Sequence, residues 1–211
     1  MKIIHQTAEL LTKVNQVETL KTLELYGRNC YKSEHKISAT SYKAFIELLL
    51  KRKHLSVLEH IGLTVRLITD RGILAEMTRH RLASYSVEST RYVKYKNIEF
   101  IYPFYQNGMI KENPYSLGAW QKAMLNAEES YQVMLEENNP PEIARSVLPM
   151  SLATDIVMTC NLREWLYILN LRRSKGVHPQ MVELMNQVYK IFHKTLPLVF
   201  NEETCPYQSV V

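Results

Sequence analysis

The sequence predicts an α+β fold: mixed helices packed on a small antiparallel-type sheet, within a single domain covering residues 1–211. First, 211 residues are enough for one domain with a sizeable core and too few for two comfortable ones. Second, several segments repeat apolar residues at helical spacing, whereas a few separated segments alternate like strands. Third, only 6 glycines and 8 prolines are present, so long disordered stretches are not expected. Many helices with scattered strands are typical of α+β proteins.

The first 60 residues predict one strand and two helices. Residues 1–7 (MKIIHQT) form a short strand, and Glu18–Lys32 and Ser41–Arg52 form helices. The expected apolar face of the first helix is Leu20, Leu23, Leu25 and Tyr26. The expected apolar face of the second is Phe45, Leu48 and Leu49.

The next segment predicts a strand, a turn and a helix. His60–Thr69 alternates as a strand does. One expected face of this strand is Leu63, Val65 and Leu67, and the other is Thr64 and Arg66. Residues 70–72 form a turn, Ile73 to about Leu82 form a helix, and Tyr85–Thr90 form a loop.

The following stretch is mainly helical. Ile98–Tyr102 is a strand that Pro103 ends, Tyr105–Asn113 is a loop, and Ser116–Glu137 is a long helix. Residues 138–142 (NNPPE) close that helix and start a short one, since proline is tolerated in a first turn. Pro149 ends the short helix.

The last third predicts one strand and two helices. Ser151–Thr159 is the strand, and Asn161 then caps a helix that runs to about Arg173, with Glu164 as its capping-box partner. Residues 174–176 form a break, and Pro179 to about Phe192 is the last long helix.

Composition limits the cellular setting and the partner. The net charge of +5 suits an anionic partner, either a phosphate-bearing metabolite or a nucleic acid. Three distant cysteines without a CxxC pair indicate free thiols in a reducing cytosol. No apolar run approaches the ~20 residues that span a bilayer, and the N-terminal segment does not look like a secretory signal. We therefore expect a cytoplasmic protein with no membrane partner.

The densest chemical signal is the segment 79–91 (RHRLASYSVESTR). Its arginines can bind phosphate or pyrimidine carbonyls in a bidentate manner, and loop hydroxyls can complete such a cradle. A solvated basic face with ordinary surface hydroxyls explains the same spacing equally well. A second signal is Arg145, although a lone arginine on a short helix is more often a surface residue or an ion-pair partner.

A third signal is the helix that begins at Asn161. Because a helix turns about 100° per residue, Asn161 and Arg172 share one side, whereas Arg163 and Arg172 point apart. One helix could serve two neighbouring ligands, or it could carry a normal cap with exposed arginines.

The sequence lacks several common metal-binding, nucleotide-binding and catalytic motifs. The segment 54–60 (HLSVLEH) has two histidines and a glutamate, but their spacing matches no zinc motif, so no metal site is predicted. The sequence has no GxGxxG, P-loop or GxSxG motif, and no cysteine is marked as an activated nucleophile.

The chain resembles the flavin-dependent thymidylate synthases. Arg79-His80-Arg81, followed by seven residues and Ser89, is similar to the RHR-x7-S signature of that family, and Thr90-Arg91-Tyr92 continues it. Five further blocks in the family's order are HLSVLEHI (54–61), EIARSVLP (142–149), NLREW (161–165), LNLR (169–172) and HPQM (178–181).

The resemblance implies a homotetramer with active sites at subunit interfaces, which methylates dUMP to dTMP. FAD is the implied cofactor, NADPH and methylenetetrahydrofolate are co-substrates, and no nucleic-acid partner is implied. The implied cofactor-binding residues are His54, Ser56, Arg79, His80, Arg81, Val87, Asn161, Leu162, Arg163 and Tyr167. The implied substrate-binding residues are Glu76, Met77, Thr78, Arg79, Val87, Glu88, Ser89, Thr90, Arg91, Arg145 and Arg172.

Arg172 is the implied catalytic residue. A fixed guanidinium stabilises the negative charge that develops on the pyrimidine as it is reduced. Its pKa stays above about 12, so it acts as an electrostatic stabiliser. Ser89 is a binding residue, because no base stands beside it in sequence. Val87 and Tyr167 depart from the family's pattern and put individual contacts in doubt.

Two alternatives remain open. A basic nucleic-acid-binding module would use the same loop, with Tyr85, Tyr92 and Tyr95 as stacking platforms and Lys94 and Lys96 as added charge. A divergent family member would act on a different pyrimidine nucleotide.

Overall fold

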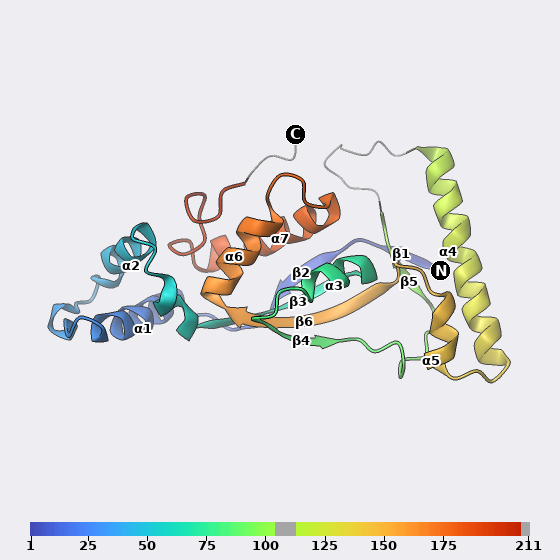
Figure 1. Cartoon of the computed structure of the whole chain (residues 1–211), viewed down its shortest axis with the longest axis horizontal. Helices are drawn as coiled ribbons and strands as arrows, with labels where there is room; N and C mark the ends of the chain where they lie inside the picture. The colour runs from blue at the N-terminus through green and yellow to red at the C-terminus, as the bar shows by residue number, and fades with distance from the viewer. Residues whose placement is uncertain (104–112, 208–211) are drawn as a thin grey trace. The chain divides into compact units, whose positions relative to one another are not determined.

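The computed structural model describes residues 1–103 and 113–207 (Figure 1). Their contacts divide the chain into two compact units. Unit 1 comprises Met1–Thr7, Leu67–Arg79 and Tyr85–Val157, and unit 2 comprises Ala8–Arg66, His80–Ser84 and Met158–Val211. Each unit is described by itself, and the single-domain organisation stays a prediction. The expected loop Tyr105–Asn113 lies, except for Asn113, outside the described residues.

Unit 1 is built around a long helix. Its helices are α3 (Arg71–Met77), α4 (Pro114–Glu136), α5 (Pro141–Ala144) and the 3-10 turn η3 (Arg145–Val147), and β1 (Lys2–Ile4) pairs in parallel with β5 (Glu99–Ile101). Figure 1 shows α4 beside α5. The side chain of Asn113 caps α4 by accepting from the Tyr115 amide at 2.9 Å. The core consists of Ile98, Phe100, Met124, Tyr131, Ala144 and Leu152.

Unit 2 packs two pairs of helices. One pair is α1 (Gln16–Asn29) and α2 (Tyr42–Lys51); the other is α6 (Leu162–Arg172) and α7 (Pro179–Thr195). The 3-10 turns are η1 (Glu34–Lys36) and η2 (Leu55–His60). The indole of the fully buried Trp165 donates to the Leu63 carbonyl at 3.0 Å and packs edge-on against Phe192, with ring centroids 5.0 Å apart.

Gly27 sets the close packing of α1 on α2. A Cβ atom at this position would lie 2.6 Å from Cε1 of Phe45, so any larger residue would push that ring aside. Arg28 covers the same ring, with its guanidinium carbon 4.5 Å from the ring centroid.

The main sheet has four strands in the order β2-β3-β6-β4. They are β2 (Thr7–Leu10), β3 (Gly62–Asp70), β4 (Ser84–Val87) and β6 (Ala153–Asn161). The predicted alternation of β3 is confirmed, because Leu63, Val65 and Leu67 are all fully buried. Helices with a small sheet confirm the α+β prediction, and the parallel β1–β5 pair is an addition to it.

Several predicted boundaries were wrong around the RHR segment. The predicted turn at residues 70–72 is the start of α3, where the Asp70 carboxylate accepts from the Ile73 amide at 2.8 Å. The helix ends at Met77 rather than at about Leu82. The first half of the expected loop Tyr85–Thr90 belongs to β4, which pairs with β6 at the edge of the sheet.

Other predictions near the N-terminus also need correction. The expected strand over residues 1–7 is two short strands, β1 and β2. Leu25, Tyr26 and Leu48, which were expected on the apolar faces, are 50%, 42% and 42% exposed. The buried positions in their place are Glu24 and Ile46. Glu24 tolerates burial because Arg28 donates to its carboxylate at 2.8 Å and the Ser41 hydroxyl at 2.9 Å.

Candidate functional site

Unit 1 contains the candidate residues at the end of α3. Glu76 is half-buried, and Thr78 and Arg79 are exposed just beyond the helix. The Met77 side chain lies in the core, and its carbonyl accepts from the Tyr85 hydroxyl at 2.7 Å. This bond fixes the C-terminal end of α3 against β4. The backbone that carries Glu76 and Arg79 is therefore anchored.

The loop after β4 is fixed by main-chain and side-chain bonds. The Glu88 amide donates to the Asp155 carbonyl at 2.9 Å, and the Ser89 hydroxyl accepts from the Arg91 amide at 3.4 Å. Arg145 donates through Nη1 to the Thr90 hydroxyl at 3.0 Å. Residues 55 positions apart in the chain therefore meet within unit 1. This arrangement brings a guanidinium beside the loop hydroxyls, as a phosphate cradle requires.

Arg91 is the only candidate of this loop with a carboxylate partner among the described residues: its Nε lies 3.5 Å from a Glu142 oxygen. Both side chains are about half exposed, so the pair is weak and can be exchanged for another anion.

Unit 2 contains the candidate catalytic arginine. Arg172, at the end of α6, donates through Nε to Nε2 of His80 at 2.9 Å. Since Nε2 accepts, the neutral His80 ring carries its proton on Nδ1. Nδ1 lies 3.8 Å from a Glu164 carboxylate oxygen. His80 is 5% exposed and Glu164 is 8% exposed, so the imidazole and the carboxylate are shielded from water, whereas Arg172 is half-buried.

Burial also sets the protonation of this cluster. Burial first, and then the charge of Arg172, lower the pKa of His80 to about 4. Burial raises the pKa of Glu164. The imidazole is therefore neutral at physiological pH and stays an acceptor for Arg172. Tyr167 covers the cluster from outside; it is 56% exposed, and its ring lies edge-on to that of His80.

A pocket of about 360 Å³ in unit 2 is lined by three implied cofactor residues, His54, Ser56 and Arg163. Arg163 also forms an exposed ion pair with Glu59. The other lining residues are Gly27, Cys30, Tyr31, Leu49, Lys53, Leu55 and Val57. The pocket combines cations, a hydroxyl and apolar walls.

Lys53 is a pocket residue that the sequence did not reveal. Its backbone has φ of +56°, a left-handed conformation that is unfavourable for lysine. The only signal was its place directly before the HLSVLEHI block, which carried no information about conformation.

Three further candidates of unit 2 differ in their surroundings: one caps a helix, one is buried and one is exposed. Asn161 caps α6 as predicted, accepting from the Glu164 amide at 2.9 Å. Leu162 is fully buried and its amide donates to the Ile61 carbonyl. Arg81 is exposed.

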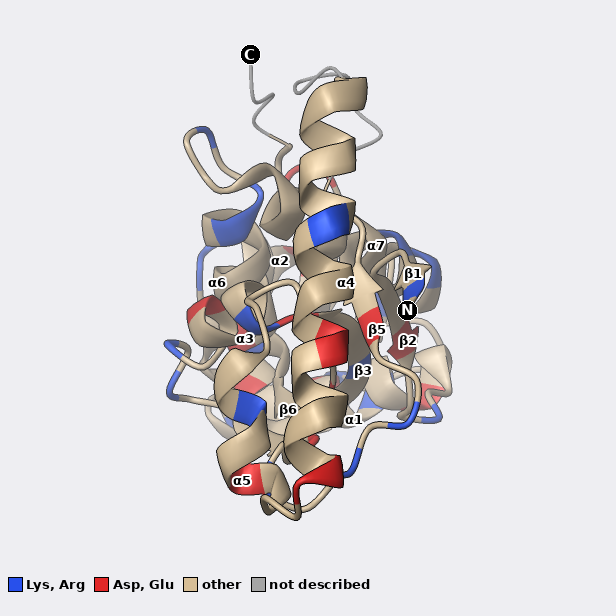
Figure 2. Cartoon of the chain, turned by 90° about the vertical axis from the view of Figure 1, so that its right-hand side faces the viewer, with Lys and Arg blue, Asp and Glu red and all other residues tan. Residues whose placement is uncertain are grey.

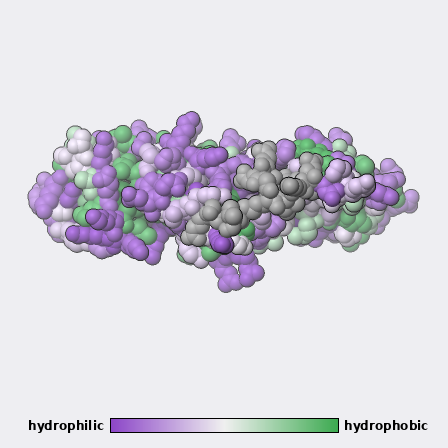
Figure 3. All heavy atoms as spheres, turned by 90° about the horizontal axis from the view of Figure 1, so that it is seen from above, coloured by the Kyte–Doolittle hydropathy of each residue, from purple (hydrophilic) through white to green (hydrophobic). Residues whose placement is uncertain are grey.

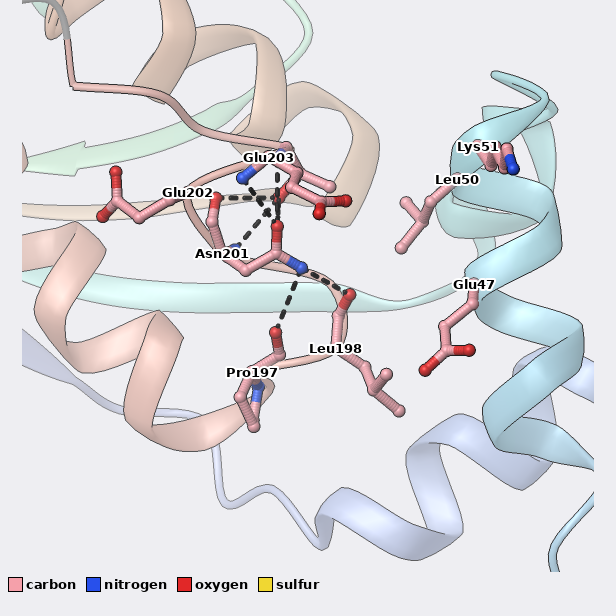
Figure 4. A pocket seen from close by; sticks show the side chains of 9 residues that line it. Glu47, Leu50, Lys51, Pro197, Leu198, Asn201, Glu202 and Glu203 are labelled. Carbon is pink, nitrogen blue, oxygen red and sulfur yellow. Dashed lines mark hydrogen bonds between the residues drawn. The ribbon is translucent and has the colours of Figure 1, made fainter.

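A larger hollow of about 890 Å³ lies between α2 and the segment 197–204 (Figure 4). Asn201 organises that segment: its side-chain amide donates to the Leu198 carbonyl, and its side-chain oxygen accepts from the amides of Glu203 and Thr204. Three glutamates, Glu47, Glu202 and Glu203, line the hollow. This negative charge disfavours an anionic nucleotide.

The stacking platforms of the nucleic-acid alternative are largely engaged in unit 1. The Tyr85 hydroxyl is bonded to Met77, and the half-buried Tyr95 packs on Tyr131 with ring centroids 6.0 Å apart. Of the three, only Tyr92 is largely exposed, at 77%. Figure 2 also shows acidic residues on α4 of the same unit. These observations disfavour an aromatic stacking surface.

Two absences apply to residues 1–103 and 113–207. They contain no helix both long and apolar enough for a membrane span. They also contain no group of three or more His, Cys, Asp or Glu side chains arranged to hold a metal ion.

A family model described as "Thymidylate synthase complementing protein" matches residues 10–198. The chain belongs to this family. Members similar to it are named flavin-dependent thymidylate synthases. The protein from Geobacter sulfurreducens is 29% identical over 84% of this chain and 79% of its own length. The probable enzyme of Paramecium bursaria Chlorella virus 1 is 28% identical over 94% and 95%.

The fold of this family member is also found in a solved structure. A UMP/dUMP methylase, PolB from Streptomyces cacaoi, bound with 5-Br dUMP, superposes with a TM-score of 0.81. The match has 23% sequence identity and covers 100% of this chain and 99% of that one. This likeness supports the α+β fold assignment.

Proposed function

We propose that the protein is an FAD-dependent methyltransferase that converts dUMP to dTMP. Methylenetetrahydrofolate supplies the carbon, and NADPH reduces the flavin. Family membership supports this reaction, and the names of the relatives agree with it. The single observation that carries the substrate site is the bond from Arg145 to Thr90, which joins two distant family blocks around one loop.

The proposed nucleotide contacts are those that the family resemblance implies. We assign dUMP contacts to Glu76, Met77, Thr78, Arg79, Val87, Glu88, Ser89, Thr90, Arg91, Arg145 and Arg172. Arginines bind the 5′-phosphate bidentately and stay charged at cellular pH. Met77 and Val87 contribute through their backbones, because Met77 is buried and a valine side chain offers no polar group.

The pocket beside His54 fits part of an FAD molecule. The diphosphate requires cations and hydroxyls, which Arg163, Lys53 and Ser56 provide, and the ring systems require apolar walls. We assign cofactor contacts to His54, Ser56, Arg79, His80, Arg81, Val87, Asn161, Leu162, Arg163 and Tyr167. FAD, when bound and reduced, supplies the hydride for the reaction.

Arg172 is the proposed catalytic residue. Its guanidinium stabilises the negative charge that develops on the pyrimidine, and it does so best when it is already oriented. His80 provides this orientation by accepting from Nε at 2.9 Å. Ser89 is proposed as a binding residue, since its hydroxyl accepts from a backbone amide rather than donating to a base.

We further propose a cytoplasmic homotetramer with active sites shared between subunits. Figure 3 shows hydrophobic side chains on the surface over α1 with α2 and over α4. Leu25, Tyr31, Leu125 and Val133 are each at least 50% exposed. Apolar surface on both units is consistent with subunit contacts.

A second candidate is methylation of a different pyrimidine nucleotide. Val87 supports it, because its apolar side chain replaces the polar residues that many family members have there. UMP is the natural comparison, since it differs from dUMP only by one ribose hydroxyl.

Purified protein tests the proposal directly. We expect flavin absorbance in the visible spectrum, and release of tritium from 5-labelled dUMP when NADPH and methylenetetrahydrofolate are present. Parallel assays with labelled UMP decide between the two nucleotides. A colourless protein that releases no tritium from either nucleotide, even after FAD is added, contradicts the proposal.

A further inference from the structure

Arg71 is the first residue of α3 and has no assigned contact with either ligand. Its two Nη groups both donate to the Glu88 carbonyl, each at 3.3 Å. Its own amide donates to the Met150 carbonyl at 3.0 Å. The side chain thus joins the helix that bears Glu76 to the loop that bears Ser89 and Thr90.

Tyr95 lies beside this connection. The Nε of Arg71 is buried and has no hydrogen-bond partner among the described residues. Glu88 and Arg71 both act on the nearby Tyr95 hydroxyl, through hydrogen bonding and through their charges. The Tyr95 amide donates to the Tyr131 hydroxyl at 3.3 Å, and the Tyr95 carbonyl accepts from the Gln132 side chain at 2.9 Å. Arg71 and Tyr95 are thus packed against Glu88, where the loop after β4 begins.

The backbone of Glu88 is therefore held at both its amide and its carbonyl. Its amide donates to Asp155 on β6, and its carbonyl accepts from Arg71 on α3. At the other end of α3, the bond between the Tyr85 hydroxyl and the Met77 carbonyl forms a second connection between the same two segments. The loop begins directly after this fixed unit.

We propose that Arg71 is a positioning residue for the nucleotide loop: it holds the Glu88 carbonyl, with Tyr95 packed behind it, so that residues 89–91 are ordered before dUMP binds. The inference rests on the proposed function, since it takes dUMP as the ligand of this loop. A loop that is already ordered loses less conformational entropy when the nucleotide binds. Removing Arg71 therefore weakens nucleotide affinity without removing a ligand contact.

The experiment compares Arg71→Met, Arg71→Lys and Tyr95→Phe with the wild type, all as FAD-loaded full chains. Calorimetric titration measures the Kd for dUMP, and tritium release gives kcat and KM. We expect Arg71→Met to raise Kd and KM about tenfold, with a smaller change in kcat and unchanged flavin content. Arg71→Lys keeps one hydrogen-bond donor. Compared with Arg71→Met, we therefore expect it to restore about a third of the change in log Kd.

Arg28→Met is the matched structural control. Arg28 is also partly buried and bonded within the protein, to Glu24 of unit 2, so its loss lowers the melting temperature. Its side-chain partners, Glu24 and Phe45, both belong to unit 2, and we expect dUMP affinity of the folded protein to stay at the wild-type value. If Arg71→Met does not fold, Arg71→Lys and Tyr95→Phe still test the inference.

The outcomes separate the two proposals. Wild-type protein that binds dUMP, together with Arg71 and Tyr95 variants of unchanged dUMP affinity, overturns this inference alone. The same result follows if the variants lose melting temperature as Arg28→Met does but keep wild-type Kd. Wild-type protein that binds FAD but neither dUMP nor UMP overturns the proposed function, and this inference with it.

Discussion

Nε of Arg172 lies 2.9 Å from Nε2 of His80, and the opposite ring nitrogen of that histidine faces Glu164. The contact joins two family blocks, RHR and LNLR, that stand 92 residues apart. It makes the neutral imidazole an acceptor for the arginine and so gives His80 a role through Arg172.

Replacing Arg172 tests the proposed catalytic step. We expect Arg172→Ala to slow turnover about 100-fold, because a preorganised donor is lost where charge develops. The visible spectrum should keep its flavin bands. Loss of flavin from this variant would instead assign Arg172 to the cofactor site.

His80 variants test how Arg172 is oriented. We expect His80→Leu, which has no acceptor, to lower kcat about tenfold, and His80→Gln, whose side-chain oxygen can accept, to retain more activity. Steady-state tritium release measures both. If both variants lose activity equally, or neither does, acceptance by His80 is not what orients Arg172.

The buried histidine also predicts a pH dependence of stability. The pKa of His80 is about 4 in the folded protein and about 6.5 when unfolded, so the unfolded chain binds more protons between these values. Stability from this group is therefore complete above about pH 6.5 and decreases as pH falls toward 4, by about 2 to 3 kcal/mol.

Glu164 partly opposes this trend, because its raised pKa makes the folded state the better proton acceptor above the ordinary carboxyl range. Melting temperatures measured from pH 4 to 8 test the sum. His80→Gln is the control and should have a smaller decrease between pH 6.5 and 4; an identical profile would contradict the assignment.

Lys53 and Lys32 form a matched pair for the cofactor pocket. Both have a left-handed backbone, with φ of +56° and +48°, but only Lys53 lines the pocket. We expect glycine at either position to raise stability by about 0.5 to 1 kcal/mol, as strain is removed. Thermal unfolding measures this gain.

The two glycine variants should differ in cofactor affinity. We expect Lys53→Gly to weaken FAD binding about tenfold through loss of a cation near the diphosphate. Lys32→Gly should bind FAD as the wild type does. Equal FAD affinity in both variants would remove Lys53 from the cofactor site.

Elements with a strong local signal were predictable from the sequence. The alternation of β3 and the cap at Asn161 each depend on nearby residues, and both are found as predicted. β4 was not predictable, because a four-residue edge strand is stabilised by its pairing with β6 rather than by its own composition.

The candidate site was predictable to the extent that it lies in sequence blocks. The proximity of Thr90 and Arg145, and that of His80 and Arg172, depends on the tertiary fold, because each pair is far apart in the chain. Exposure of Leu25 and Tyr26 was missed for a related reason. A helical stripe shows which residues share a face, but the neighbouring helix decides how much of that face is covered.

The three cysteines differ sharply in accessibility. Cys160 and Cys205 are buried, and burial raises the pKa of both thiols, whereas Cys30 is exposed at the edge of the pocket that contains His54. Since thiolates are the reactive form, a maleimide dye added to the native protein should attach mainly at Cys30. The natural sequence thereby offers a single attachment point for a fluorescent reporter of cofactor loading, without any engineered mutation.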